Sequence, residues 1–314
     1  MTAAAVPADL MASSRDAYRD ALLAAMPLDD RLVCLDSDTG LFLGKDFGTA
    51  ADRYLNLGIA EQNLLGAAAG LAHCGRIPFV NTMATFASTR ALETVKIDLA
   101  YANLPVRIAA THSGLSAGNL GPTHHSLEDL AIMRLLPGMT VLVPADAAAT
   151  ATLFEQCRDL PGPVYLRLDR IPTPVLSVDA PPLRIGQAQP LRQGTDVLLV
   201  CCGPYPVQLA LRAAELLAAR GIEAAVLNMH TVKPLDERAL AGCDAPVVTI
   251  EEHWRTGGLG SAVAEALAET GRRVHRVGVP DRFVSMAGDQ RFLLERSGVT
   301  AVSIEAAAVR ALTE

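Results

Sequence analysis

Short apolar runs alternate along the first half of the chain with longer segments of helical periodicity. The runs predict β-strands at residues 31–36, 77–81, 106–111, 140–143 and 164–167. Between them, the spacing of apolar residues predicts helices over residues 15–25, 61–72 and 84–100, and another from about residue 126. Strands that alternate with helices form parallel sheets covered on both faces, so we expect a doubly wound parallel sheet in an α/β domain.

Five prolines between residues 171 and 190 interrupt this pattern and indicate a linker, because proline resists regular structure. After them, a helix over 208–220 and apolar runs at 196–202, 224–228, 247–251 and 274–277 predict a second, smaller α/β domain. We therefore divide the chain into a flexible arm (1–14), a first domain (15–175), a Pro-rich linker (176–192) and a second domain (193–314).

Composition is consistent with two globular domains. The chain has 314 residues, 50% of them hydrophobic, and single cores seldom grow beyond about 250 residues. Its 27 basic and 34 acidic residues give a net charge of -7, which argues against nucleic acid or a membrane surface as the partner. No apolar run approaches the roughly 18 residues of a membrane span, and the first 14 residues lack the basic start of a secretory signal. The six cysteines form no Cys-x-x-Cys pair, which is typical of reduced thiols in a cytoplasmic protein.

One carboxylate, Glu61, opens a Gly/Ala-rich apolar segment that continues to Leu71. Removing a carboxylate from water is costly, so its presence at this place suggests a chemical role. The simpler interpretation is structural, because a negative charge in the first turn of a helix faces the positive end of the helix dipole.

The residues around Glu61 favour the chemical role. Segment 58–63 has the sequence GIAEQN and resembles the glutamate motif in the pyrimidine-binding domain of transketolases and their thiamine-diphosphate relatives. In that family the glutamate hydrogen-bonds N1′ of the cofactor's aminopyrimidine and favours the tautomer that takes the thiazolium C2 proton. The resemblance implies that Glu61 binds and activates thiamine diphosphate.

Four segments of the second half also look like the transketolase C-terminal domain: NMHTVKPLD (228–236), EEH (251–253), GGLG (257–260) and GVPDRF (278–283). The family holds the diphosphate and Mg²⁺ on a separate domain that starts with Gly-Asp-Gly, which this sequence lacks. We therefore predict the C-terminal subunit of a split, two-chain transketolase. It would work only with an N-terminal partner subunit that holds most of the Mg²⁺ contacts, in an α2β2 heterotetramer.

The same resemblance implies neighbours for the cofactor. Phe86 matches the aromatic residue that stacks on the aminopyrimidine, and Met83, Asp38 and Thr39 match other positions beside the cofactor. Met83 and Thr89 stand where many relatives carry aromatic residues, so we expect a looser pocket. Without the resemblance, a single phenylalanine on a helix is more often part of the core.

A polar loop at residues 111–125 follows a predicted strand, which is where parallel sheets place their ligands. His112 and His124 match family histidines that contact the sugar substrate, the first near its phosphate end and the second near the reacting carbonyl. We expect His125 to face elsewhere. Arg15 and Arg170 match arginines that grip the substrate phosphate. The structural alternative is that the histidines bond loop carbonyls and the arginines lie in solvent.

Two residues depart from the family pattern. Leu120 stands where many transketolases have an aspartate that binds a substrate hydroxyl, and Phe42 stands where a phosphate-contacting serine is expected. A leucine cannot accept that hydrogen bond, so we expect a substrate that is less hydroxylated or less dependent on phosphate than the pentose phosphates.

The implied activity is transfer of a two-carbon ketol unit from a ketose or ketose phosphate to an aldehyde, with Glu61, His112 and His124 as catalytic residues. Two alternatives share the fold. The first is a β-type subunit of a 2-oxoacid dehydrogenase or a 1-deoxyxylulose-5-phosphate-synthase-like enzyme, although GPTH (121–124) and KPLD (233–236) look closer to transketolase. The second is a non-catalytic scaffold or regulatory subunit.

Overall fold

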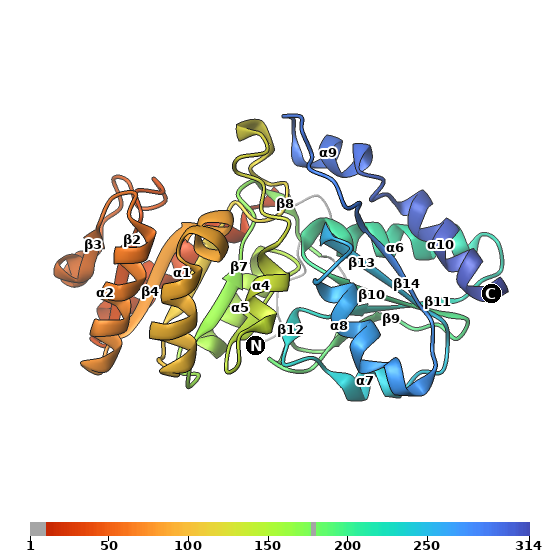
Figure 1. The fold of residues 1–314 in the computed structure, drawn as a ribbon, viewed down its shortest axis with the longest axis horizontal. Helices are drawn as coiled ribbons and strands as arrows, with labels where there is room; N and C mark the ends of the chain where they lie inside the picture. The colour runs from red at the N-terminus through yellow and green to blue at the C-terminus, as the bar shows by residue number, and fades with distance from the viewer. Residues whose placement is uncertain (1–10, 177–179) are drawn as a thin grey trace.

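The first half of the chain builds a seven-stranded sheet. The computed structural model describes residues 11–176 and 180–314, and Figure 1 shows this sheet beside a second one. The strand order is β12-β6-β7-β5-β4-β2-β3. Six strands run parallel: β2 (Leu32–Asp36), β3 (Tyr54–Asn56), β4 (Ile77–Met83), β5 (Arg107–Thr111), β6 (Thr140–Leu142) and β7 (Val164–Arg167). The prediction of a parallel α/β domain is confirmed.

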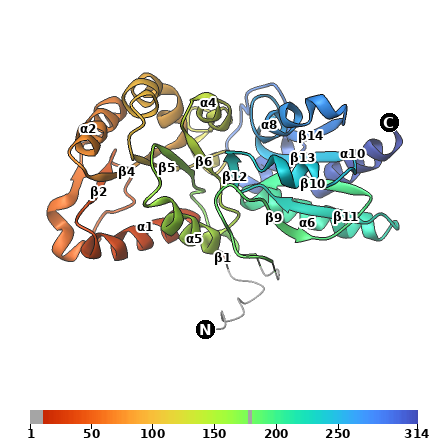
Figure 2. The same cartoon turned by 90° about the horizontal axis from the view of Figure 1, so that it is seen from below.

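Helices cover both faces of this sheet. In Figure 2, α1 (Ser14–Ala25) and α5 (Ala147–Cys157) lie on one face, and α2 (Glu61–His73) and α4 (Asp129–Leu135) on the other. The rings of Tyr18, Phe79 and Phe154 pack between α1, α5 and β4, with centroids 5.2 to 6.2 Å apart. The helices on the two faces bury the side chains of the sheet, and this packing fixes the strand ends that carry the polar loops.

The predicted helix at residues 84–100 is helical but irregular. It consists of two π-helical stretches, η3 (Phe86–Arg90) and η4 (Val95–Tyr101), on either side of the short helix α3 (Leu92–Thr94). A π-helix has i→i+5 hydrogen bonds and is wider than an α-helix, and short π-helical stretches are frequent at functional sites. Here it places the side chains of Phe86 and Arg90 against each other.

The second half forms a five-stranded sheet of order β14-β13-β10-β11-β9. Its strands are β9 (Gln189–Arg192), β10 (Val197–Cys202), β11 (Ala224–Asn228), β13 (Val247–Trp254) and β14 (Val274–Val279). Helices α6 (Pro204–Ala218) and α10 (Ala301–Thr313) share one hydrophobic core with these strands, and α8 (Leu259–Ala266) belongs to the core that continues from the first sheet. Strand β9 falls in the stretch that we expected to be a linker. Its Pro190 is tolerated because β9 lies at the edge of the sheet.

Smaller elements complete the fold. Strand β12 (Thr231–Lys233) belongs to the second half of the sequence but pairs antiparallel with β6, at the edge of the first sheet. The others are η1 (Met26–Leu28), η2 (Gly48–Arg53), η5 (Gly118–Leu120), η6 (Ala268–Thr270), α7 (Glu237–Ala241) and α9 (Gln290–Arg296).

The end of the predicted N-terminal arm is attached to the fold. Residues 1–10 of that arm lie outside the described residues. Strand β1 (Met11–Ala12) pairs antiparallel with β8 (Thr173–Pro174), and the Ser13 hydroxyl caps α1 by accepting from the Asp16 N–H at 3.2 Å. The chain therefore brings the start of α1 beside the segment that follows β7.

Across residues 11–176 and 180–314, none of the helices is long and apolar enough to cross a lipid bilayer. All six cysteines carry free thiols; Cys34, Cys157, Cys201 and Cys202 are buried, whereas Cys74 is exposed.

Candidate active site

Several residues predicted to act in catalysis or to bind cofactor or substrate lie at the carboxyl ends of the parallel strands. Met83 is the last residue of β4, and His112 follows the last residue of β5. Arg170 comes three residues after the end of β7. Ligands of parallel sheets bind at this edge because loops leave the sheet there and helices begin there.

Glu61 is the first residue of α2, and its side chain is 2% exposed. The residue before it, Ala60, provides no side-chain cap for the helix. One carboxylate oxygen, Oε2, accepts a hydrogen bond from Arg90 Nη1 at 2.8 Å. The carboxylate is thus buried at a helix N-terminus and paired with one cation, an arrangement that stabilises its negative charge.

Arg90 was missed by the sequence analysis. It is the single charged residue between Arg76 and Glu93. A lone charged residue in an apolar helix indicates a possible functional role, and the same feature singled out Glu61. The partnership itself, between residues 29 positions apart, is set by tertiary packing.

Phe86 lies at the centre of a small group of side chains. The Arg90 Cζ atom lies 4.2 Å from the centroid of its ring, and the His124 imidazole meets the ring edge-to-face with centroids 5.5 Å apart. The structure therefore brings Glu61, Phe86 and His124 into one cluster, with Arg90 between the first two.

His112 is held in an unusual backbone conformation. Its φ is 58°, in the left-handed region that non-glycine residues seldom adopt, and its side chain is 4% exposed. The ring Nδ1 and the Thr111 hydroxyl are 2.9 Å apart. Burial, followed by the charges of Arg15 and Arg170, lowers the pKa of His112 to about 3. The imidazole is therefore neutral at physiological pH.

Arg15 and Arg170 are close enough to influence each other. Burial lowers the pKa of Arg15, and the neighbouring charge of Arg170 adds to this shift. The two residues come near each other because α1 begins beside the segment after β7, where the Ser13 hydroxyl donates to the Arg170 carbonyl at 3.3 Å. Two arginines beside a neutral histidine form a positive region suited to an anionic group.

Asp38 and Thr39 follow β2, and each has a hydrogen-bond partner in a neighbouring strand, at the end of β3 or of β2. The Thr39 hydroxyl donates to Asp36 Oδ1 at 2.6 Å, and the Asn56 amide donates to Asp38 at 3.2 Å. Their assignment to the cofactor, like that of Met83, remains a prediction.

The two departures from the family pattern differ in exposure. Phe42 is 2% exposed and packs against Phe47 and Tyr54, with ring centroids 5.5 and 5.8 Å apart. It is part of a core. Leu120 is 44% exposed and lies in η5, within the loop that carries both histidines.

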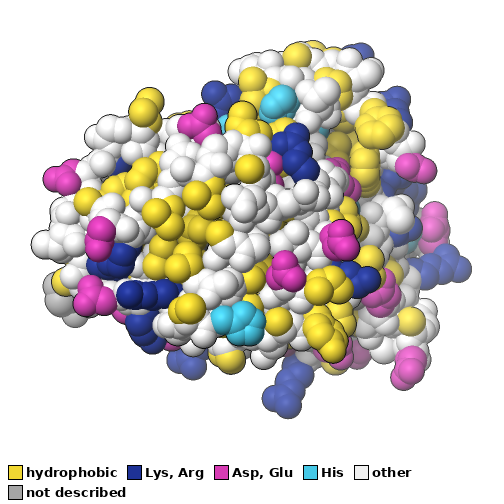
Figure 3. Space-filling view, turned by 60° about the vertical axis from the view of Figure 1, so that its left-hand side comes forward, with side chains coloured by type: hydrophobic (Ala, Val, Ile, Leu, Met, Phe, Trp, Pro, Cys, Tyr) yellow, Lys and Arg dark blue, Asp and Glu magenta, His cyan; other side chains and the backbone are white. Residues whose placement is uncertain are grey.

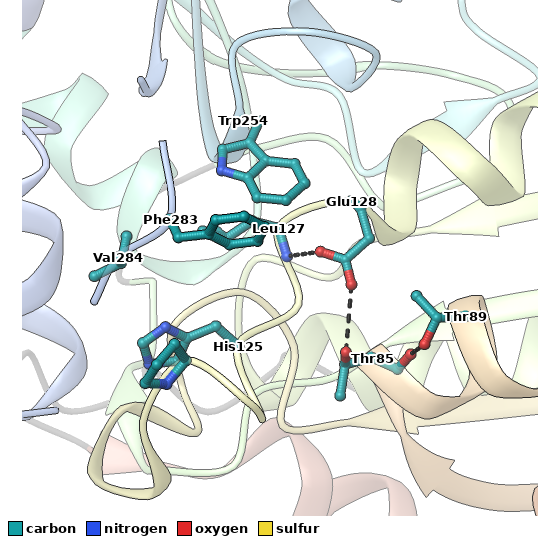
Figure 4. A pocket seen from close by; sticks show the side chains of 9 residues that line it. Thr85, Thr89, His125, Leu127, Glu128, Trp254, Phe283 and Val284 are labelled. Atoms are coloured by element: carbon teal, nitrogen blue, oxygen red, sulfur yellow. Dashed lines mark hydrogen bonds between the residues drawn. The ribbon is translucent and has the colours of Figure 1, made fainter. Parts of the chain in front are cut away.

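A cavity of about 330 Å³ lies between the two halves of the chain. Its lining includes Thr85 and His125, the sequence neighbours of Phe86 and His124. Figure 4 shows Glu128 and Thr85 on one side, His125 on the opposite side, and Trp254 and Phe283 from the second half. The Thr85 hydroxyl donates to Glu128 at 3.3 Å, and burial, followed by the charge of nearby Asp129, raises the pKa of Glu128. His125 thus borders this cavity, and its ring does not take part in the contact between Phe86 and His124.

Behind the histidine loop, buried polar side chains connect the two halves of the chain. The Gln290 amide nitrogen donates to Asp169 at 2.8 Å and to Glu252 at 2.9 Å. Glu252 also accepts from the Leu115 N–H at 2.5 Å, and the Ser113 hydroxyl donates to Asp169 at 2.9 Å. The network supports the loop that begins at His112. No local pattern indicated it, because its members come from distant parts of the chain.

Comparison with known proteins identifies two family domains in the chain. Residues 11–174 match the family described as the transketolase pyrimidine-binding domain, and residues 186–304 match the transketolase C-terminal domain. A 6-deoxy-6-sulfo-D-fructose transketolase subunit from Clostridium sp. (strain MSTE9) is 42% identical over 94% of this chain and 92% of its own. An apulose-4-phosphate transketolase subunit from Phocaeicola vulgatus is 36% identical over 95% of this chain and 98% of its own.

A solved structure with the same arrangement is described as a split-gene transketolase in an inactive β4 tetramer. It superimposes with a TM-score of 0.85 and 42% sequence identity, covering 96% of this chain and 98% of the other.

Proposed function

The chain belongs to the transketolase family, as the C-terminal subunit of a split enzyme, and on that premise we propose which of its residues act and on what. The observation that carries the proposal is the cluster of Glu61, Phe86 and His124. A buried carboxylate beside an aromatic face suits the aminopyrimidine of thiamine diphosphate, because the ring can stack while its N1′ shares a proton with the carboxylate.

Thiamine diphosphate, when bound, supplies the carbanion nucleophile and holds the electrons of the transferred unit. In our proposal Glu61 holds the proton at N1′. His124, in contact with Phe86, donates to the reacting carbonyl oxygen of the substrate. The neutral imidazole of His112 donates a hydrogen bond without adding charge.

The positive region at Arg15 and Arg170 supports a substrate with a terminal anion. The names of two relatives include a sulfonated sugar and a sugar phosphate, both of which end in a tetrahedral oxyanion. Arginine binds such groups through two parallel N–H bonds. We propose a ketose donor with a terminal phosphate or sulfonate, and an aldehyde acceptor.

The proposed partner is an N-terminal subunit that holds the diphosphate and Mg²⁺. The sequence lacks the Gly-Asp-Gly start, and the described residues contain no group of three or more side chains able to hold a metal ion. Ile59, two residues before Glu61, is 73% exposed, and Ile97 and Tyr101 are also exposed. Figure 3 shows hydrophobic side chains gathered on a face that includes the left-hand side of Figure 1. These features support a partner that covers the site in an α2β2 assembly.

We place the assembly in the cytoplasm. The support for this is the set of six free thiols, four of them in hydrophobic surroundings.

The experiment that tests the function is reconstitution with the chain encoded beside this one, if that chain carries the diphosphate motif. The pair is assayed with a phosphorylated or sulfonated ketose and an aldehyde, in the presence of thiamine diphosphate and Mg²⁺. We expect ketol transfer. Loss of activity in Glu61→Ala would exclude a scaffold role for this subunit, whereas full activity would support one.

Pyruvate serves as the competing donor, because one relative is a 1-deoxy-D-xylulose-5-phosphate synthase from Gloeobacter violaceus, 40% identical over 83% of this chain. The match covers only 42% of that enzyme. Release of carbon dioxide from pyruvate without ketol transfer would favour a synthase or a 2-oxoacid dehydrogenase.

A further inference from the structure

The guanidinium of Arg90 makes two contacts at once. Its Nη1 donates to Glu61 Oε2 at 2.8 Å, and its Cζ lies over the Phe86 ring, 4.2 Å from the centroid. These are the two contacts that our proposed function gives to the aminopyrimidine: a nitrogen against the carboxylate and a flat face against the aromatic ring. A guanidinium, like an aminopyrimidine, is planar, delocalised and rich in N–H donors, and it stacks on aromatic faces.

We propose that Arg90 is a placeholder in the cofactor site. In the chain without cofactor, its guanidinium occupies the position of the aminopyrimidine, and it moves aside when the cofactor binds. This inference rests on the proposed function, because it requires the aminopyrimidine to lie between Glu61 and Phe86. It gives a role to Arg90, which no sequence motif singled out.

The main chain at Arg90 is anchored, whereas its side chain has room to move. The Gln62 amide of α2 donates to the Arg90 carbonyl at 3.1 Å, which holds the end of the π-helical stretch η3. The Arg90 side chain is 46% exposed, in contrast to 2% for Glu61. The guanidinium can therefore turn into solvent by rotation about side-chain bonds, without disturbing η3 or α2.

The contact between Arg90 and Glu61 stabilises the chain without cofactor and opposes cofactor binding. Without Arg90, the buried Glu61 carboxylate would have no charged partner, and the N-terminus of α2 would be left to stabilise it. Arg90 therefore balances the charge of Glu61 when no cofactor is bound. The same contact competes with the cofactor, which must break an ion pair and a cation–π contact before it can bind.

The first test measures cofactor affinity in the reconstituted complex. We compare the Kd of thiamine diphosphate, by equilibrium dialysis with Mg²⁺, for the wild type and Arg90→Met. Methionine keeps the unbranched stem of the side chain but has no guanidinium to pair with Glu61. We expect the variant to bind about fivefold more tightly, a change consistent with the loss of a partly exposed ion pair and a surface cation–π contact. Unchanged or weaker binding would overturn the placeholder.

Two further variants sharpen this test. Arg212→Met removes an exposed arginine that pairs with Glu215 on α6. It therefore removes the same single positive charge as Arg90→Met but away from the site, and we expect no change in Kd. Arg90→Lys keeps the charge but loses the planar face, and we expect an affinity between those of wild type and Arg90→Met. A lysine variant that binds more weakly than the wild type would contradict the proposal.

The second test uses the chain alone and needs no cofactor. Unfolding of wild type, Arg90→Met, Glu61→Gln and the double variant forms a double-mutant cycle. We expect the effects to be non-additive, with a coupling of about two- to fivefold in the unfolding equilibrium constant. Additive effects would show that the contact is absent and would overturn the placeholder.

The outcomes separate the two proposals. If the wild-type complex does not bind thiamine diphosphate, the proposed function fails and the placeholder fails with it. If the wild type binds and Arg90→Met binds no more tightly, only the placeholder fails.

Discussion

The carboxyl groups of Asp169 and Glu252, one from each half of the chain, both accept hydrogen bonds from the side-chain amide of Gln290. Both carboxyls are buried. Burial, followed by the nearby charge of Asp169, raises the pKa of Glu252 to about 8, and the pKa of Asp169 is also raised. One amide thus joins two acids behind the loop that carries His112.

This relationship predicts a pH-dependent stability. The ordinary pKa of a glutamate is 4.5, so between pH 4.5 and about 8 the folded state binds more protons than the unfolded state. The stabilisation is therefore fully present below pH 4.5 and is lost as the pH rises through 8. We expect the free energy of unfolding to fall with rising pH over this range, by roughly 1 kcal/mol per pH unit at most from this one group.

Thermal unfolding of wild type and Glu252→Gln at several pH values between 5.5 and 8.5 measures this effect. The neutral variant should show a flatter profile over that range. Glu265→Gln is the matched control, because Glu265 is 64% exposed, and its profile should follow the wild type. Three buried histidines have lowered pKa values: His112, His230 and His253. Their effect is opposite, because it makes the free energy of unfolding rise with pH below 6.5. It is the same in all three proteins and does not affect the comparison. Parallel profiles for Glu252→Gln and wild type would refute the prediction.

Replacing Glu61 by glutamine should remove activity while the fold is retained. Glutamine has nearly the shape of glutamate but cannot hold the proton at N1′, so we expect kcat of the reconstituted complex to fall by about 100-fold or more. The cost in stability should be only about 1 kcal/mol, because the partner Arg90 is half exposed and can be solvated. Steady-state kinetics and circular dichroism measure the two effects. Retained activity would remove Glu61 from the catalytic residues.

Replacing Arg170 by methionine should weaken the binding of anionic substrates. Loss of a charge-assisted hydrogen bond costs about 1.5–3 kcal/mol, so we expect KM for a phosphorylated or sulfonated ketose to rise about tenfold or more. KM for a neutral acceptor such as glycolaldehyde should change little. Arg19→Met is the control, because Arg19 lies one turn after Arg15 on α1 and pairs with Asp16 and Asp20. Equal effects on charged and neutral substrates would argue against an anion site.

Replacing Arg167 by methionine should destabilise the junction between the two halves. Arg167 pairs with Asp129 at 2.8 Å while both side chains are almost fully buried, and it also donates to the Glu252 carbonyl at 3.0 Å. Removing one member of a buried pair leaves an uncompensated charge and costs about 3–5 kcal/mol. Urea denaturation measures the loss. The double variant Arg167→Met, Asp129→Leu should recover part of it, and a double variant less stable than Arg167→Met would contradict this explanation.

Local sequence pattern was sufficient for much of the fold. The helix predicted over 15–25 is observed as Ser14–Ala25, and the strand predicted over 164–167 is observed as Val164–Arg167. Both have the apolar spacing of their element and polar residues near their ends. Helix α5 (Ala147–Cys157) was not predicted, because its alanine-rich sequence shows little contrast between a polar and an apolar face.

The candidate site divides in the same way. Glu61, Phe86 and the histidine loop were found because short motifs keep chemistry-bearing residues together along the chain. The residues that support them were not found. Arg90 reaches Glu61 across 29 positions, and Gln290 reaches Asp169, which bonds Ser113 of the histidine loop, across 121 positions. The pairing of β12 with the first sheet is of the same kind, since the two strands are far apart in sequence.

The order of apolar and polar residues thus determined the class of fold and the carboxylate that opens α2, since both depend on neighbours within a few positions. Packing between distant segments decided which charge faces that carboxylate and how the two halves are joined. It did so because hydrogen bonds and ion pairs depend on distance in space, and no local pattern of residues records that distance.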